Sequence, residues 1–135
     1  MGIDYGRVRI GLAMSDLTQT IASPITVINA EKTFPLTIQK ILSHINMKEC
    51  DLFVMGLPLL MNGKESEMSE EVRKFGALLE QETGKKVIFW DERLTSKEAE
   101  RAMIAGNLKR KSRKENSDTV SAILILQSYL NCQKF

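Results

Sequence analysis

The apolar residues of this chain change their period near residue 34, and this change restricts the fold classes open to it. Between residues 8 and 14, apolar residues alternate with polar or small ones, as in a β-strand with one apolar face. From about residue 34 to residue 47, apolar residues recur at helical spacing. Short apolar runs at 51–57 and 87–90 then alternate with further helical patterns. Strands followed by alternating helices and strands are typical of an α/β protein with a mixed sheet.

Capping residues and glycines mark where the predicted helices begin and end. Gly84 ends the second helix, and Thr95 with Glu98 forms a capping-box signature for a third helix that runs to about Gly106. We therefore expect one five-stranded mixed sheet with helices on both of its faces. The predicted strands cover residues 1–6, 8–14, 25–28, 51–57 and 87–90, and the predicted helices cover residues 34–47, 68–83, 95–106 and 117–130.

The chain has the length of one domain. Its 135 residues, 43% of them hydrophobic and 27% charged, are typical of a single globular domain, residues 1–135, with a sizeable core. No apolar run reaches the ~18 residues of a membrane span, and Asp4, Arg7 and Arg9 interrupt the N-terminus too early for a signal peptide. Cys50 and Cys132 have neither disulfide-framework nor zinc-site spacing. These features predict a cytoplasmic protein with free thiols and no membrane partner.

The positive charge of the chain is concentrated in one basic stretch. The formal net charge is only +2, yet five of the six residues from 109 to 114 are basic, so the rest of the chain sums to −3. A cationic stretch on an acidic body favours contact with a polyanion such as nucleic acid. A solvated loop between two helices explains the same run equally well. The basic residues are Lys109, Arg110, Lys111, Arg113 and Lys114.

Three acidic residues occupy positions from which such a sheet could bring them together. Asp4 lies near the end of the first strand, Glu92 just follows the last strand, and Asp118 begins the final helix. In parallel α/β units, the strand ends form the crevice where ligands bind. Neighbouring carboxylates repel unless a cation joins them, and oxygen ligands without histidine or cysteine favour Mg²⁺ or Mn²⁺ over zinc. Because side chains alternate along a strand, only one of Asp91 and Glu92 can face such a site.

Each of these acids also has an ordinary structural use. Asp4 could stabilise a turn, Glu92 could pair with Arg93, and Asp118 could interact with the dipole of the helix that it begins. The residues alone therefore leave a metal site and three separate structural roles open. Nucleophilic hydrolysis is less well supported, because the single histidine, His44, has no partner at a recognisable spacing.

Four sequence blocks follow one another along nearly the whole chain. They are Gly2-Ile3-Asp4-Tyr5-Gly6 with Arg9-Ile10-Gly11-Leu12-Ala13, then Val54-Met55-Gly56-Leu57-Pro58-Leu59 with Asn62-Gly63, then Asp91-Glu92-Arg93-Leu94-Thr95-Ser96, and finally Asp118 with Ala122 and Ile125-Leu126-Gln127-Ser128-Tyr129-Leu130. Together they resemble the YqgF family of Holliday junction resolvase-like proteins, also described as pre-16S ribosomal RNA nucleases. The resemblance implies a ribonuclease H-like fold, which agrees with the predicted order of strands and helices.

The resemblance further implies a metal-dependent endonuclease. Asp4, Glu92 and Asp118 would form its catalytic acidic site and hold one or two Mg²⁺ or Mn²⁺ ions, while Arg9 and the basic stretch would hold the phosphate backbone. The expected function is processing of the 5′ end of pre-16S rRNA in ribosome biogenesis, by a monomer or weak homodimer. Two alternatives stay open, namely a Holliday junction resolvase-like DNA nuclease and a non-catalytic RNA-binding factor in ribosome assembly or transcription.

The chain departs from the family pattern near this acidic site. Resolvases of this fold often carry a fourth acid one helical turn after the last one, and here that position, three residues past Asp118, is Ser121. Fewer carboxylates provide less charge to hold a second cation. Asp16 and Asp91 are candidate substitutes, and the sequence selects neither of them.

Overall fold

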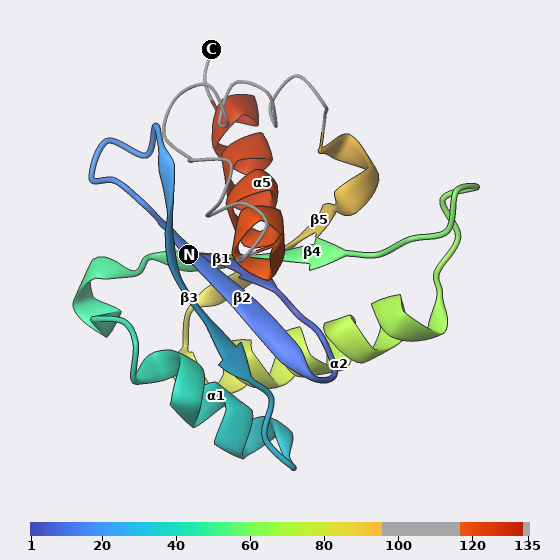
Figure 1. The fold of residues 1–135 in the computed structure, drawn as a ribbon, viewed down its shortest axis with the longest axis horizontal. Coiled ribbons are helices and arrows are strands. Elements are labelled where there is room, and N and C mark those ends of the chain that lie inside the picture. Colours follow the sequence, from blue (N-terminus) through green and yellow to red (C-terminus); the bar gives the residue numbers. More distant parts are fainter. Residues whose placement is uncertain (96–116, 134–135) are drawn as a thin grey trace.

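The chain forms a five-stranded mixed sheet of order β3-β2-β1-β4-β5 (Figure 1). The computed structural model describes residues 1–95 and 117–133, with side chains through residue 95 and from residue 120 on. Antiparallel pairing joins β1 to β2 and β2 to β3, and parallel pairing joins β1 to β4 and β4 to β5. The strands are β1 (Gly2–Asp4), β2 (Arg9–Ser15), β3 (Ala22–Asn29), β4 (Leu52–Leu57) and β5 (Lys86–Asp91). The helices are α1 (Phe34–Leu42), α2 (Glu67–Thr83) and α5 (Ser117–Cys132), with short 3-10 helices η1 (Met47–Glu49) and η2 (Glu92–Leu94).

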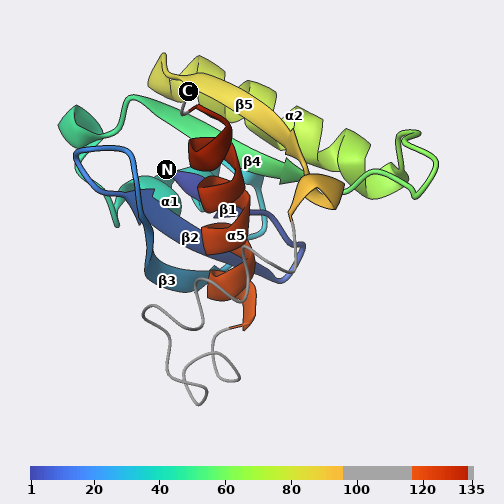
Figure 2. The same cartoon turned by 90° about the horizontal axis from the view of Figure 1, so that it is seen from above.

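Helices cover both faces of the sheet, so the predicted α/β class and layering are confirmed (Figure 2). On one face, α1 and α2 cover the larger core, which includes the fully buried Phe53 and Phe75. On the other face, Leu126 of α5 belongs to a smaller core with Val54 and Ala13 of the sheet. Burial of this apolar surface is the main favourable term in folding. No helix among the described residues is long and apolar enough to span a membrane.

The second face of β2 is buried, although the alternation pattern predicts only one apolar face. Ile10 and Leu12 belong to the larger core, while Gly11 and Ala13 are buried on the side of α5. The approach of α5 to the sheet is close, since a β-carbon at Gly2 would lie 2.7 Å from Cβ of Leu126. Small residues on this face therefore serve helix packing rather than solvent exposure.

The helix boundaries follow their capping residues. Thr33 caps the start of α1, but α1 ends at Leu42 and not at the predicted residue 47. Ser43 caps the end of α1, and its hydroxyl donates to the carbonyl oxygen of Lys40 at 2.6 Å. Asn46 then has an extended backbone and accepts from Lys48 N at 3.1 Å, so it begins η1 and the helix does not resume. Ser66 caps α2 in a capping box, and Gly84 ends α2 with φ 69°.

The third predicted helix, 95–106, falls almost entirely outside the described residues. Within them, Thr95 follows the short helix η2 and caps its end. Its backbone N–H and its hydroxyl both donate to the carbonyl oxygen of Glu92, at 3.2 and 2.7 Å. Thr95 therefore stabilises the turn that directly follows β5.

Candidate active site

Two of the three predicted acids lie in one pocket at the carboxyl edge of the parallel strands. Asp4 is the last residue of β1, and Glu92 directly follows β5. These strands are not neighbours, because β4 lies between them. Both side chains nevertheless line a pocket of about 320 Å³. The other lining residues are Thr95 and, from α5, Ser121, Leu124 and Ile125.

Gly56 of β4 makes room for the Glu92 side chain. A β-carbon at Gly56 would lie 2.5 Å from Oε1 of Glu92 and 2.5 Å from Cδ1 of Ile125. Non-bonded heavy atoms do not pack this closely in a protein interior. A larger residue would displace the ends of the Glu92 and Ile125 side chains, and the Glu92 side chain extends over β4, the strand that separates it from Asp4.

Burial raises the pKa of the Glu92 carboxyl above its usual value, and the nearby charge of Asp91 raises it further. The folded protein therefore holds this proton to a higher pH than the unfolded chain does. As the pH rises through the usual value of 4.5, ionisation of Glu92 accordingly lowers the free energy of unfolding.

Glu92→Gln is therefore expected to raise the melting temperature at pH 7 in metal-free buffer, because the amide carries no charge to desolvate. At pH 4, where the folded glutamate is protonated, wild type and Glu92→Gln are expected to have the same melting temperature. Circular dichroism melts with EDTA measure both temperatures. A lower melting temperature for the variant at pH 7, or an equal gain at both pH values, would contradict this effect.

Asp91 lies next to Glu92 but binds Arg93 instead of lining the pocket. Its carboxylate accepts from Nη2 of Arg93 at 2.7 Å and from Nε at 3.0 Å, which lowers the pKa of Asp91. Nη1 of Arg93 also donates to the carbonyl oxygen of Met61 at 3.2 Å, so this pair anchors the loop after β4. A pairing of Glu92 with Arg93, the alternative open from the sequence, is absent among the described contacts.

Asp16, the other candidate substitute ligand, does not line the pocket of Asp4 either. Its carboxylate stabilises the turn between β2 and β3, accepting from the Thr18 hydroxyl at 2.6 Å and from the backbone N–H groups of Thr20 and Ile21 at 2.7 and 3.0 Å. These hydrogen bonds, that of Thr18 foremost, lower the pKa of Asp16 to about 2. Neither candidate substitute therefore joins Asp4 and Glu92 in the pocket.

The turn after Asp4 is held to α2 by Glu71, a residue that sequence reasoning missed. The Tyr5 hydroxyl donates to Oε2 of Glu71 at 2.7 Å, and Nε of Arg7 donates to Oε1 at 3.0 Å. Burial raises the pKa of the Tyr5 phenol, and the hydrogen bond to Glu71 raises it further. No local signal links these residues, because 66 positions separate Tyr5 from Glu71.

The structure describes only some of the remaining predicted site residues. Arg9 begins β2 and is exposed, and strand alternation puts it on the same face of the sheet as Asp4. Asp118 lies in the first turn of α5, three residues before Ser121, and its side chain is outside the description. Among the described side chains, no three His, Cys, Asp or Glu residues form a metal-binding group. The basic residues Lys109, Arg110, Lys111, Arg113 and Lys114 lie outside the described residues.

Solved structures with the same fold include RuvC of Thermus thermophilus. Its complex with a Holliday junction substrate matches with a TM-score of 0.58 at 13% sequence identity, over 98% of this chain and 92% of that chain. A second Thermus thermophilus RuvC structure matches with a TM-score of 0.56 at 12% identity, over 98% and 93%. At this level of identity the likeness concerns the fold alone, and it confirms the ribonuclease H-like architecture.

Curated relatives are much closer in sequence. A protein of Protochlamydia amoebophila is 42% identical over 97% of this chain and 91% of its own length. A protein of Caldanaerobacter subterraneus is 42% identical over 99% of this chain and 96% of its own length. Both carry the name "Putative pre-16S rRNA nuclease". The family model RuvX, described as Holliday junction resolvase, matches residues 1–132. The resemblance found in the sequence is thereby confirmed, and the chain belongs to the RuvX family.

Proposed function

We propose that this protein is a nuclease that cleaves pre-16S rRNA at its 5′ processing site, with a divalent cation as cofactor. The observation that carries the proposal is the pocket that Asp4 and Glu92 share at the carboxyl edge of the sheet. Membership of the RuvX family and relatives named for pre-16S rRNA cleavage support the same reaction class. Hydrolysis is expected to leave a 5′-phosphate and a 3′-hydroxyl.

The donor atoms of the pocket fit Mg²⁺ or Mn²⁺. Asp4 and Glu92 offer carboxylate oxygens, and no histidine or cysteine is among the described lining residues. The charge of Glu92 is disfavoured by burial and by Asp91, and a cation bound between the acids would offset that cost. When bound, the cation supplies Lewis-acid activation of the phosphate and of the attacking water. We propose Asp118 as the third ligand, on the family resemblance and its place one turn before Ser121.

The chain's own residues hold the acids in position. Thr95 fixes the carbonyl of Glu92, and the missing side chain of Gly56 lets Glu92 extend toward β1. Glu71 holds the turn after Asp4 through Tyr5 and Arg7. Such positioning matters because small displacements of reacting groups cost large factors in rate.

Arg9 and the basic stretch at 109–114 are proposed to bind the phosphate backbone. Arg9 lies on the same face of the sheet as Asp4, at the edge where the pocket opens. Contacts of arginine and lysine with phosphates are largely independent of sequence and weaken as salt is added. Sequence-independent binding fits a substrate that is recognised by its structure.

A DNA junction is the alternative substrate, favoured by the description of the family as Holliday junction resolvase. A cleavage assay separates the two, with an end-labelled pre-16S rRNA fragment and a four-way DNA junction, each with Mn²⁺ or with EDTA. The proposal predicts cleavage of the RNA at the mature 5′ end, abolished by EDTA. Preferential cleavage of the junction would support the alternative. RNA binding without cleavage of either substrate would contradict nuclease activity and favour a binding factor.

A further inference from the structure

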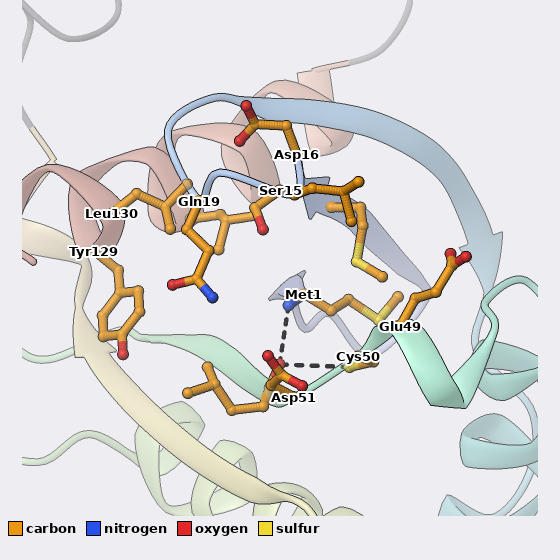
Figure 3. Close-up of a pocket in the computed structure, with 13 residues that line it drawn as sticks. Met1, Ser15, Asp16, Gln19, Glu49, Cys50, Asp51, Tyr129 and Leu130 are labelled. Atoms are coloured by element: carbon orange, nitrogen blue, oxygen red, sulfur yellow. Dashed lines mark hydrogen bonds between the residues drawn. The ribbon is translucent and has the colours of Figure 1, made fainter.

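A second pocket, of about 450 Å³, opens at the amino ends of β1 and β4, the edge of the sheet opposite Asp4 and Glu92 (Figure 3). Four separate parts of the described chain line it. They are Met1, the end of β2 with the turn that follows it, the start of β4 with the residues just before it, and the last turns of α5. Neither the reaction proposed above nor the family resemblance gives this pocket a role.

The walls of the second pocket are held in place before any ligand binds. Asp16 fixes the turn between β2 and β3 through three hydrogen bonds. Gln127 of α5 binds the same turn from the other side, since its side chain accepts from Ala22 N at 2.9 Å and donates to the carbonyl oxygen of Thr20 at 2.9 Å. A site formed in advance loses less conformational freedom on binding, which favours affinity.

One wall of the second pocket is apolar. Leu126, Tyr129 and Leu130 of α5 form this α5 wall, and Leu52 begins the strand beside them. At the rim, Leu17 is 97% exposed, although a leucine side chain prefers burial. Covering Leu17 and the α5 wall with a partner's apolar side chain would remove this surface from water.

The rim of the second pocket is acidic. Asp16, Glu49 and Asp51 line it, and the one cationic group among its described lining residues is the N-terminal ammonium of Met1, which donates to the carbonyl oxygen of Leu52 at 2.9 Å. In Figure 3, Asp16 and Asp51 lie on opposite sides of the cavity, and the Gln19 amide is directed into it. Within the described part of the chain, that amide makes no side-chain hydrogen bond, so it can donate to and accept from a ligand.

We propose that the second pocket binds a peptide segment of a partner protein in which basic side chains alternate with leucine-sized apolar ones. The acidic rim attracts the basic side chains, and the apolar α5 wall accepts their leucine-sized neighbours. The same negative charge repels the phosphates of RNA and DNA, so this edge of the molecule does not extend the proposed nucleic-acid surface. The inference does not depend on the nuclease activity proposed above.

The test uses fluorescein-labelled, C-terminally amidated hexapeptides and the full chain. A peptide of alternating arginine and leucine is expected to bind in fluorescence polarisation. Peptides with glutamate in place of arginine, or with serine in place of leucine, are expected to bind at least about tenfold more weakly. In amide NMR spectra, the arginine–leucine peptide is expected to shift the signals of Leu17, Gln19 and Tyr129.

Two charge-reversed proteins distinguish this pocket from general attraction between charges. Glu49→Lys with Asp51→Lys is expected to weaken binding of the arginine–leucine peptide about tenfold. Glu70→Lys with Glu82→Lys changes the net charge equally at exposed positions of α2, and is expected to bind like wild type. Leu17→Ser, at a side chain too exposed to support the fold, is expected to weaken binding at least about fivefold.

Several results would overturn the proposal. They are the absence of binding by the arginine–leucine peptide, an equal loss in the two charge-reversed proteins, wild-type binding by Leu17→Ser, and shifts centred on Asp4 and Glu92. None of these readouts uses cleavage. Failure of peptide binding therefore leaves the nuclease proposal untouched, and failure of cleavage leaves this one untouched.

Discussion

Asp4→Asn or Glu92→Gln is expected to lower the rate of metal-dependent RNA cleavage by about a thousandfold, equivalent to ~4 kcal/mol of transition-state stabilisation. Each variant keeps the shape of the side chain and removes the charge that holds the cation. Both residues line one pocket, and each substitution leaves that pocket with one carboxylate fewer for the cation. Single-turnover rates with saturating Mn²⁺ measure the loss. Asp118→Asn is expected to cause the same loss, on the family resemblance.

Matched controls make this result specific. Asp51→Asn and Glu70→Gln change the same chemical groups at exposed positions outside the pocket of Asp4 and Glu92. Both variants are expected to cleave at the wild-type rate. Circular dichroism melts verify that all the variants fold. Wild-type cleavage by folded Asp4→Asn and Glu92→Gln would exclude the pocket as the catalytic site.

Gly56→Ala is expected to damage stability and cleavage together. The new methyl group would lie 2.5 Å from both Oε1 of Glu92 and Cδ1 of Ile125, so the ends of these two side chains must shift. Overpacking of this kind costs ~1–3 kcal/mol of the free energy of unfolding. A displacement of about 1 Å in a reacting group costs ~100-fold in rate. Denaturant unfolding and single-turnover cleavage measure the two effects.

Gly84→Ala provides the control for Gly56→Ala. Gly84 ends α2 with φ 69°, and nothing lies within 4 Å of a β-carbon there. Alanine at this position costs ~1–2 kcal/mol through its backbone conformation alone. This variant is expected to lose stability but to cleave normally when folded. If Gly56→Ala instead kept both wild-type stability and wild-type cleavage, the close approach of Glu92 to β4 would be wrong.

The fold could be predicted to a large extent, because strand and helix periods are local properties of the sequence. The apolar run at 51–57 predicts a strand buried on both faces, and β4 places Phe53 in the larger core and Val54 in the smaller one. The end of α1 was predicted wrongly. Ile45 and Met47 continue the apolar pattern, but the Ser43 hydroxyl binds the carbonyl of Lys40 at the end of α1, and Asn46 begins a separate short helix.

The site could be predicted only where it follows from strand alternation. Alternation shows that only one of Asp91 and Glu92 can face a given side of the sheet, but which one depends on where α5 packs. The role of Gly56 depends on β4 lying between β1 and β5, and an apolar run does not reveal that order. The link from Tyr5 to Glu71 likewise depends on the packing of α2 against the sheet.

Binding of Mn²⁺ in the absence of nucleic acid, followed by electron paramagnetic resonance, tests the proposed metal site most directly. Wild-type protein and the control Asp51→Asn with Glu70→Gln are expected to bind the ion with the same affinity. Asp4→Asn with Glu92→Gln is expected to bind it at least ~100-fold more weakly, because the loss of ligands exceeds the 10–100-fold loss typical of their outer-shell partners. Equal Mn²⁺ affinity in all three proteins would contradict a metal site built from these carboxylates.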